Sequence, residues 1–122
     1  MKIVGIDYGR KKIGLAISEG ILAEPWKVIK VNDFEEAVRK VLQILKELKA
    51  DGAVVGVSEG EMGEESKKFA ERINAETFDE TLSTYNAQEL SREAKVGRKK
   101  RKDLEDAFAA SVMLQLYLDT YV

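Results

Sequence analysis

The distribution of apolar residues along the chain predicts five strands. The first, residues 2–8, is apolar almost throughout, as in a central strand that is buried on both faces. Residues 26–31 alternate apolar and polar side chains, which is typical of a strand with one buried face. The single proline, Pro25, directly precedes this segment and marks its beginning. The predicted strands are residues 2–8, 13–18, 26–31, 53–57 and 75–78.

Apolar residues at helical spacing predict four helices. The first begins at Asn32, because Glu35 follows three positions later in a capping-box arrangement. The third begins at Ser83 or Thr84, either of which is a good helix cap. The predicted helices are residues 32–49, 61–73, 83 or 84 to 94, and 103 onward.

The order of these elements predicts the fold class. A short turn at residues 9–12 joins the first two strands as an antiparallel hairpin. The chain then continues from this opening meander into strand–helix units. We therefore expect an α/β protein with a mixed five-stranded sheet and helices on both faces. A length of 122 residues suits one domain, residues 1–122.

The composition restricts the chemistry that the chain can perform. It contains neither cysteine nor histidine, which excludes thiol nucleophiles, the usual catalytic triads and the common zinc sites. Any catalytic metal must be held by oxygen, which favours Mg²⁺ or Mn²⁺. The longest apolar stretch is far shorter than the roughly 20 residues that cross a bilayer, and the amino terminus does not resemble a signal peptide. We expect a cytoplasmic protein with no membrane partner.

Positive charge is concentrated in one segment. The net charge is only −2, yet six of the eight residues at positions 95–102 are basic. Such a run in a loop is a candidate phosphate-binding patch, and it is equally consistent with a solvated loop that has no partner.

Asp7 is the first candidate for a catalytic role. It ends a strand that is otherwise apolar, and burying a lone carboxylate is expensive. In open α/β sheets, ligands bind beyond the carboxyl ends of the strands. The alternative is a structural carboxylate that accepts hydrogen bonds from the turn near Gly9.

Other acidic residues could join Asp7. Asp79 and Glu80 follow the fifth strand, and they could also cap the helix that comes next. Asp106 and Glu105 begin a largely apolar helix, where periodicity does not choose between them. Three carboxylates at one crevice would form an oxygen-only metal site suited to two-metal displacement at phosphorus.

Four segments of the chain resemble the YqgF/RuvX family, relatives of Holliday junction resolvases within the RNase H superfamily. They are IVGIDYGRKKIGLAIS (3–18), VVGV (54–57), FDETLST (78–84) and EDAFAASVMLQLYLD (105–119). The resemblance implies an RNase H-like fold and a nuclease that uses Mg²⁺ or Mn²⁺ and matures the 5′ end of pre-16S rRNA. Matching positions imply that the catalytic and metal-binding carboxylates are Asp7, Glu80 and Asp106.

The chain departs from the family pattern at two places. Glu59 lies where the family usually has a longer polar loop, and it is either a further metal ligand or a solvated acid. Thr81 stands where the family has an arginine, so a bidentate phosphate donor is missing there. Arg10 or the basic run could compensate. The residues that we expect to contact nucleic acid are Arg10, Lys11, Arg98, Lys99, Lys100, Arg101 and Lys102.

Three alternatives to an rRNA nuclease follow from the same residues. The pattern Asp7-x-Gly9-x-x-x-x-Gly14 also resembles the phosphate-binding hairpin of actin-like kinases, which need two domains where this chain has the length of one. A second alternative is resolution of branched DNA, which needs paired active sites. A third is a nucleic-acid-binding module without catalysis. We expect a monomer or a homodimer that binds pre-rRNA or, alternatively, branched DNA.

Overall fold

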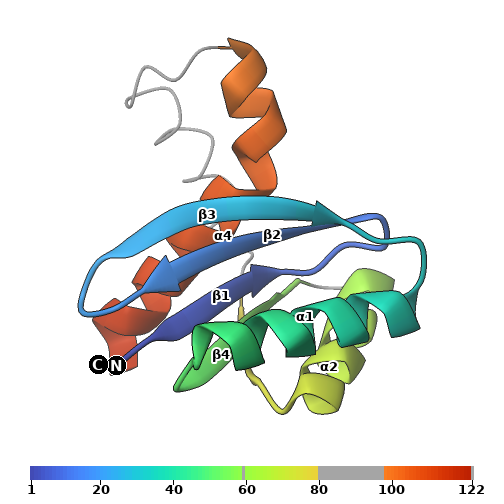
Figure 1. Cartoon of the computed structure of the whole chain (residues 1–122), viewed down its shortest axis with the longest axis horizontal. Helices are drawn as coiled ribbons and strands as arrows, with labels where there is room; N and C mark the ends of the chain where they lie inside the picture. Colours follow the sequence, from blue (N-terminus) through green and yellow to red (C-terminus); the bar gives the residue numbers. More distant parts are fainter. Residues whose placement is uncertain (59, 80–97, 122) are drawn as a thin grey trace.

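A computed structural model describes residues 1–58, 60–79 and 98–121, with the backbone alone for residues 98–104. The described part holds five strands and three helices (Figure 1). In chain order they are β1 (Ile3–Asp7), β2 (Lys12–Ser18), β3 (Ala23–Lys30), α1 (Phe34–Leu48), β4 (Gly52–Val57), α2 (Glu61–Ile73), β5 (Glu76–Asp79) and α4 (Arg98–Tyr121).

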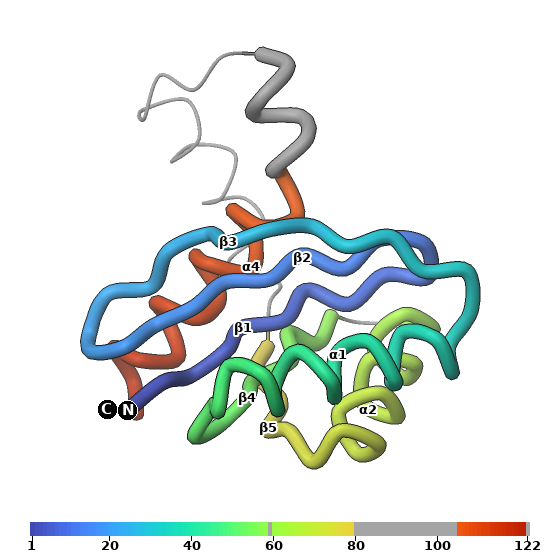
Figure 2. The backbone as a smooth tube through the Cα atoms, in the orientation of Figure 1, coloured from blue at the N-terminus to red at the C-terminus, as the bar shows by residue number. Residues whose placement is uncertain are grey.

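The strands form one mixed sheet in the order β3-β2-β1-β4-β5. The pairs β1–β2 and β2–β3 are antiparallel, whereas β4 pairs in parallel with both β1 and β5. Figure 2 shows β5 beyond β4, on the side of the sheet away from β3. Because β1, β4 and β5 run in the same direction, their last residues Asp7, Val57 and Asp79 lie along one edge, which we call the carboxyl edge.

Helices cover both faces of the sheet, as the sequence predicts (Figure 1). Alternate residues of β1 separate the two layers, because successive side chains of a strand point to opposite faces. Val4, Ile6 and Tyr8 pack in the cluster beneath α1 and α2. Ile3 packs in the second cluster, against Ala110, Met113, Leu114 and Leu118 of α4. Asp7 shares the strand face of Ile3, so its side chain belongs to the α4 side.

Helix α1 begins one residue later than the capping-box pattern predicts. Its N-cap is Asp33, whose extended backbone (φ −154°) lets the side chain accept a hydrogen bond from the Glu36 amide at 2.8 Å. The Asn32 amide instead donates to the Glu36 carboxylate at 3.2 Å. Both residues are good caps, and Asp33 is the one that takes the position.

Strand β3 begins earlier than predicted, so Pro25 lies inside it. The pairing of β2 with β3 shifts between Leu15, opposite Lys27, and Ala16, opposite Pro25. This irregularity lies on an edge strand, where a residue without a backbone N–H is tolerated. The prediction that Pro25 precedes the strand was therefore wrong.

Helix α4 also begins earlier than predicted, at Arg98 instead of Asp103. The basic residues 98–102 are therefore helical, although the sequence predicts a loop there. Lysine and arginine are good helix formers, and this preference outweighs the unfavourable position of cations at a helix amino terminus. The predicted helix from residue 83 or 84 to 94 lies outside the described residues. None of the described helices combines the length and apolar character needed to cross a membrane.

Candidate active site

Asp7 is the last residue of β1 and is partly buried at the carboxyl edge. Its partner across the antiparallel pair is Gly14 of β2. Directly paired residues of antiparallel strands present their side chains on the same face, with Cα atoms about 4.5–5.5 Å apart. The Asp7 carboxylate therefore lies on the face of the sheet that α4 covers, next to the space that a side chain at position 14 would occupy.

Gly14 brings the start of the apolar part of α4 onto this area. A Cβ atom at Gly14 would lie 2.0 Å from the backbone oxygen of Asp106 and 2.8 Å from the backbone nitrogen of Ala107. Only a residue without a side chain permits this approach. Gly14 thus pairs with Asp7 and contacts the backbone of Asp106, two acids that are 99 positions apart in the sequence.

The structure also distinguishes Asp106 from its neighbour Glu105. Asp106 is partly buried, whereas Glu105 is exposed. The residue whose backbone contacts Gly14 is Asp106. Helical periodicity leaves both acids possible, and the packing of α4 on β2 sets the backbone of Asp106 against Gly14, the residue that pairs with Asp7.

The third predicted carboxylate, Glu80, lies outside the described residues, as do Glu59 and Thr81. Asp79 ends β5 at the carboxyl edge, where it is exposed and stands in register with Val57 of β4. In the part of the chain that the structure describes, no three acidic side chains lie close enough together to hold a metal ion. Asp7 and Asp106 supply hard oxygen donors of the kind that Mg²⁺ and Mn²⁺ prefer, and Glu80 directly follows Asp79 in the sequence.

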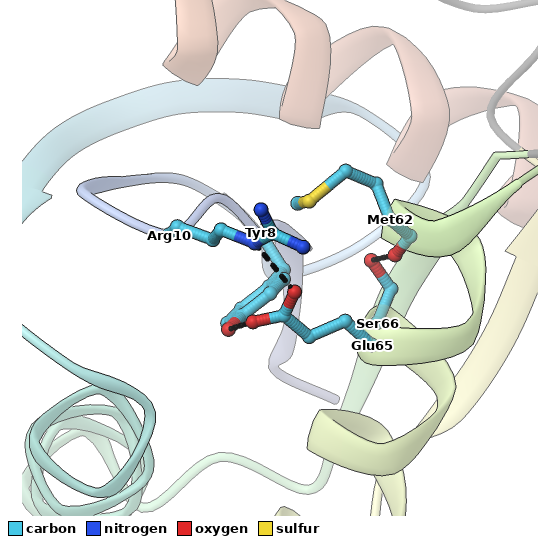
Figure 3. A network of polar contacts seen from close by, with 5 residues as sticks. All are labelled: Tyr8, Arg10, Met62, Glu65 and Ser66. Carbon is cyan, nitrogen blue, oxygen red and sulfur yellow. Dashed lines mark hydrogen bonds and ion pairs between the residues drawn. The ribbon is translucent and has the colours of Figure 1, made fainter.

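Arg10 lies in the turn that follows Asp7, where it pairs with Glu65 of α2 (Figure 3). The Arg10 Nε donates to Glu65 Oε2 at 2.7 Å, and the Tyr8 hydroxyl donates to Glu65 Oε1, also at 2.7 Å. These bonds lower the pKa of Glu65, and the Arg10 bond is the larger cause. Burial and the bond to Glu65 raise the pKa of Tyr8. The sequence does not reveal this network, because it joins residues more than 50 positions apart.

The other residues that we expect to contact nucleic acid are Lys11 and residues 98–102. Lys11 is exposed at the same turn, and its backbone oxygen accepts a hydrogen bond from Val31 at 2.9 Å. The basic residues 98–102 form the beginning of the helix that carries Asp106. Arg98 precedes Asp106 by eight positions, which corresponds to about 12 Å along a helix axis.

Tyr117 of α4 provides a test of the packing at the opposite end of the helix. Its ring packs edge-on against Phe78 of β5, and its hydroxyl donates to Glu76. The bond to Glu76, together with burial, raises the pKa of Tyr117 to about 12 from an ordinary value of 10.0. The bond therefore stabilises the fold fully below pH 10 and less as the pH rises toward 12.

We accordingly expect the difference in free energy of unfolding between the wild type and Tyr117→Phe to narrow between pH 10 and about 12. Urea denaturation of both proteins at a series of pH values measures it. A difference that stays constant over this interval would show that the phenol does not hold its proton through Glu76.

The sheet order, strand directions and helical layers define an RNase H-like fold. Solved structures with this fold match nearly the whole chain. RuvC from T. thermophilus in complex with a Holliday junction substrate superimposes with a TM-score of 0.65 at 16% identity, covering 98% of this chain and 96% of that one. The fowlpox virus resolvase in complex with Holliday junction DNA gives a TM-score of 0.56 at 15% identity, covering 100% and 99%. Residues 1–120 match the family described as "RuvX: Holliday junction resolvase", and the chain belongs to this family.

Sequence relatives agree with this assignment. A protein of Endomicrobium trichonymphae named "Putative pre-16S rRNA nuclease" is 37% identical and covers 97% of this chain and 95% of its own length. A protein of the same name from Bacillus cytotoxicus is also 37% identical, covering 98% and 99%. The predicted family and fold are thus confirmed.

Proposed function

We propose that this protein is a metal-dependent nuclease that processes the 5′ end of pre-16S rRNA in the cytoplasm. The observation that carries the proposal is the contact of Gly14 with the Asp106 backbone, which brings two acids from opposite ends of the chain to one edge of the sheet. The names of the full-length relatives support the choice of RNA substrate.

In this proposal Asp7, Asp106 and Glu80 hold Mg²⁺ or Mn²⁺. The ions, when bound, supply a more acidic water as nucleophile and charge stabilisation at the leaving oxygen. The protein's part is to fix its carboxylates. Asp7 is fixed by the β1–β2 pairing and Asp106 by the packing of α4 on Gly14. Both positions are rigid elements and not loops, which favours a precise arrangement of ligands.

We assign the binding of the RNA backbone to the basic residues that are neighbours of these acids in the chain. Arg10 and Lys11 follow Asp7 in the same turn, and residues 98–102 precede Asp106 on α4. Such cations neutralise phosphates and release counterions, which makes binding depend on salt.

The basic run gives a prediction of its own. Replacing Lys99, Lys100 and Arg101 with alanine should weaken RNA binding irrespective of sequence and reduce the slope of log Kd against log salt by about two units, roughly 0.7 per lost phosphate contact on a single strand. Fluorescence anisotropy at several salt concentrations measures the slope. An unchanged slope would show that these residues do not touch phosphates.

Cleavage of branched DNA is the second candidate, and it is favoured by the two resolvase structures that share the fold. A resolvase needs two active sites in a two-fold arrangement, so it must act as a dimer. Pre-rRNA processing needs one site and is open to a monomer.

The decisive comparison offers the protein a pre-16S 5′ fragment and a four-way DNA junction under identical conditions, with the mass measured by light scattering. We expect metal-dependent cleavage of the RNA. Cleavage of the junction alone by a dimer would overturn the proposal in favour of a resolvase. Binding of the RNA without cleavage in Mg²⁺ or Mn²⁺ would overturn it in favour of a non-catalytic binding module.

A further inference from the structure

We propose that Glu65 is a positioning residue that holds the Arg10 guanidinium ready to bind an RNA phosphate beside the acids of the carboxyl edge. This inference rests on the proposed function, and it gives a role to two residues, Glu65 and Tyr8, that the sequence does not single out. The Arg10 side chain is 61% exposed, while Glu65 is 23% exposed. Tyr8 is only 5% exposed. The three residues thus form a chain from the core to the surface (Figure 3).

The inner end of this chain is rigid. The Tyr8 ring stacks on Phe69 with centroids 4.7 Å apart and meets Phe34 edge-on at 6.2 Å. Its hydroxyl donates to Glu65 Oε1, which fixes one oxygen of the carboxylate. A phenol that is buried on its ring and bonded at its oxygen has no rotational freedom to lose when substrate binds.

Helix α2 holds Glu65 close to the carboxyl edge. A Cβ atom at Gly63 would lie 1.8 Å from the backbone oxygen of Ser58, the residue that follows β4. The first turn of α2 therefore rests directly on the end of that strand. Glu65, two residues further along, faces the turn that carries Arg10.

The remaining oxygen of Glu65 accepts from Arg10 through Nε alone. Among the described residues, no other group bonds the guanidinium, so its two terminal nitrogens keep their donors. These nitrogens are the pair that forms a bidentate contact with phosphate. An arginine fixed at Nε loses less conformational freedom on binding than one that is unrestrained.

Stability alone does not account for this arrangement. An exposed ion pair contributes little to the stability of a fold, and the chain contains a second ion pair for comparison. Arg72 pairs with Glu35 through both terminal nitrogens, at 2.6 and 2.8 Å, and no buried phenol of the described residues bonds that carboxylate. That pair joins α2 to the first turn of α1. Its arginine donates through the two terminal nitrogens, whereas Arg10 donates to Glu65 through Nε.

Positioning and simple electrostatics predict opposite signs when Glu65 is removed. Loss of an acid near a phosphate site should tighten RNA binding if only charge matters. If Glu65 positions Arg10, its loss should weaken binding. The test measures the Kd of a labelled pre-16S 5′ RNA fragment by fluorescence anisotropy, in full-length protein that also carries Asp7→Asn to prevent cleavage.

We expect Arg10→Ala to weaken binding about tenfold and to lower the salt slope by about 0.7. Glu65→Ala should weaken binding about fivefold, and the double variant should be no weaker than Arg10→Ala alone. Glu65→Gln, which keeps an acceptor for Nε, should bind nearly as the wild type does. Glu35→Ala is the matched control and should change Kd less than twofold. If Glu65→Ala does not fold, Tyr8→Phe replaces it with the same expected direction.

Unchanged or tighter binding by Glu65→Ala would overturn the inference, and so would additive losses in the double variant. If the wild type cuts the RNA and Glu65→Ala leaves the Kd for RNA unchanged, only the role of Glu65 is overturned. A wild type that neither binds nor cuts the RNA would overturn the proposed function together with this inference.

Discussion

Replacing Asp7 with asparagine is expected to reduce metal-dependent RNA cleavage by at least about a hundredfold, within the 10²–10³ range for losing one electrostatic contact to a transition state. Asparagine keeps the size of the side chain and removes the charge that attracts a divalent ion. Asp7 also lies in the pairing between β1 and β2, so the substitution tests the carboxylate without removing the strand. Single-turnover cleavage of the pre-16S 5′ fragment in Mn²⁺ measures the effect.

Asp51 provides the matched control for this experiment. It is also an aspartate beside β1, but it lies at the opposite edge of the sheet, where its carboxylate accepts from the Lys2 amide at 2.7 Å. Asp51→Asn should cut RNA at the wild-type rate. Equal rates for Asp7→Asn and the wild type would remove Asp7 from the catalytic site.

Replacing Gly14 with alanine is expected to reduce both stability and cleavage. The added methyl group would lie 2.0 Å from the Asp106 carbonyl oxygen, so either α4 or β2 must move. Buried side chains hold both elements in place. Forcing an extra methyl group between them lowers the free energy of unfolding by about 3 kcal/mol and the Tm by roughly 10 °C. Since the displaced residue is Asp106, cleavage should fall even at temperatures where the variant is folded.

Gly20→Ala separates this effect from the general cost of replacing a glycine in this hairpin. A Cβ atom at Gly20 meets no other atom within 4 Å. We expect its Tm and cleavage rate to match the wild type, with a stability change within about 0.5 kcal/mol. If Gly14→Ala were equally harmless, the close contact of α4 with β2 would not hold in solution.

The positions of most strands and helices follow from local patterns in this chain. The apolar run at residues 2–8 marks a strand that is buried on both faces, and β1 lies between two neighbours in the sheet. The spacing of apolar residues at 61–73 predicts the bounds of α2 correctly. These features depend on nearby residues alone, which is why they can be read from the sequence.

Features that depend on distant partners cannot be read in the same way. The packing that distinguishes Asp106 from Glu105 is the contact of the Asp106 backbone with Gly14, more than 90 positions earlier. The orientation of Arg10 depends on Glu65, 55 positions later. Close competition between local preferences also limits prediction. Asn32 and Asp33 are both good caps, and the basic residues 98–102 favour a helix by type while opposing it by charge.

Mn²⁺ binding followed by electron paramagnetic resonance tests, without reference to activity, whether Asp7 and Asp106 hold one divalent ion together. We expect Asp7→Asn and Asp106→Asn each to weaken Mn²⁺ binding at least about tenfold, while the exposed neighbour substitution Glu105→Gln leaves it unchanged. Wild-type affinity in Asp106→Asn, or a loss in Glu105→Gln equal to that in Asp106→Asn, would contradict a shared ion between Asp7 and Asp106.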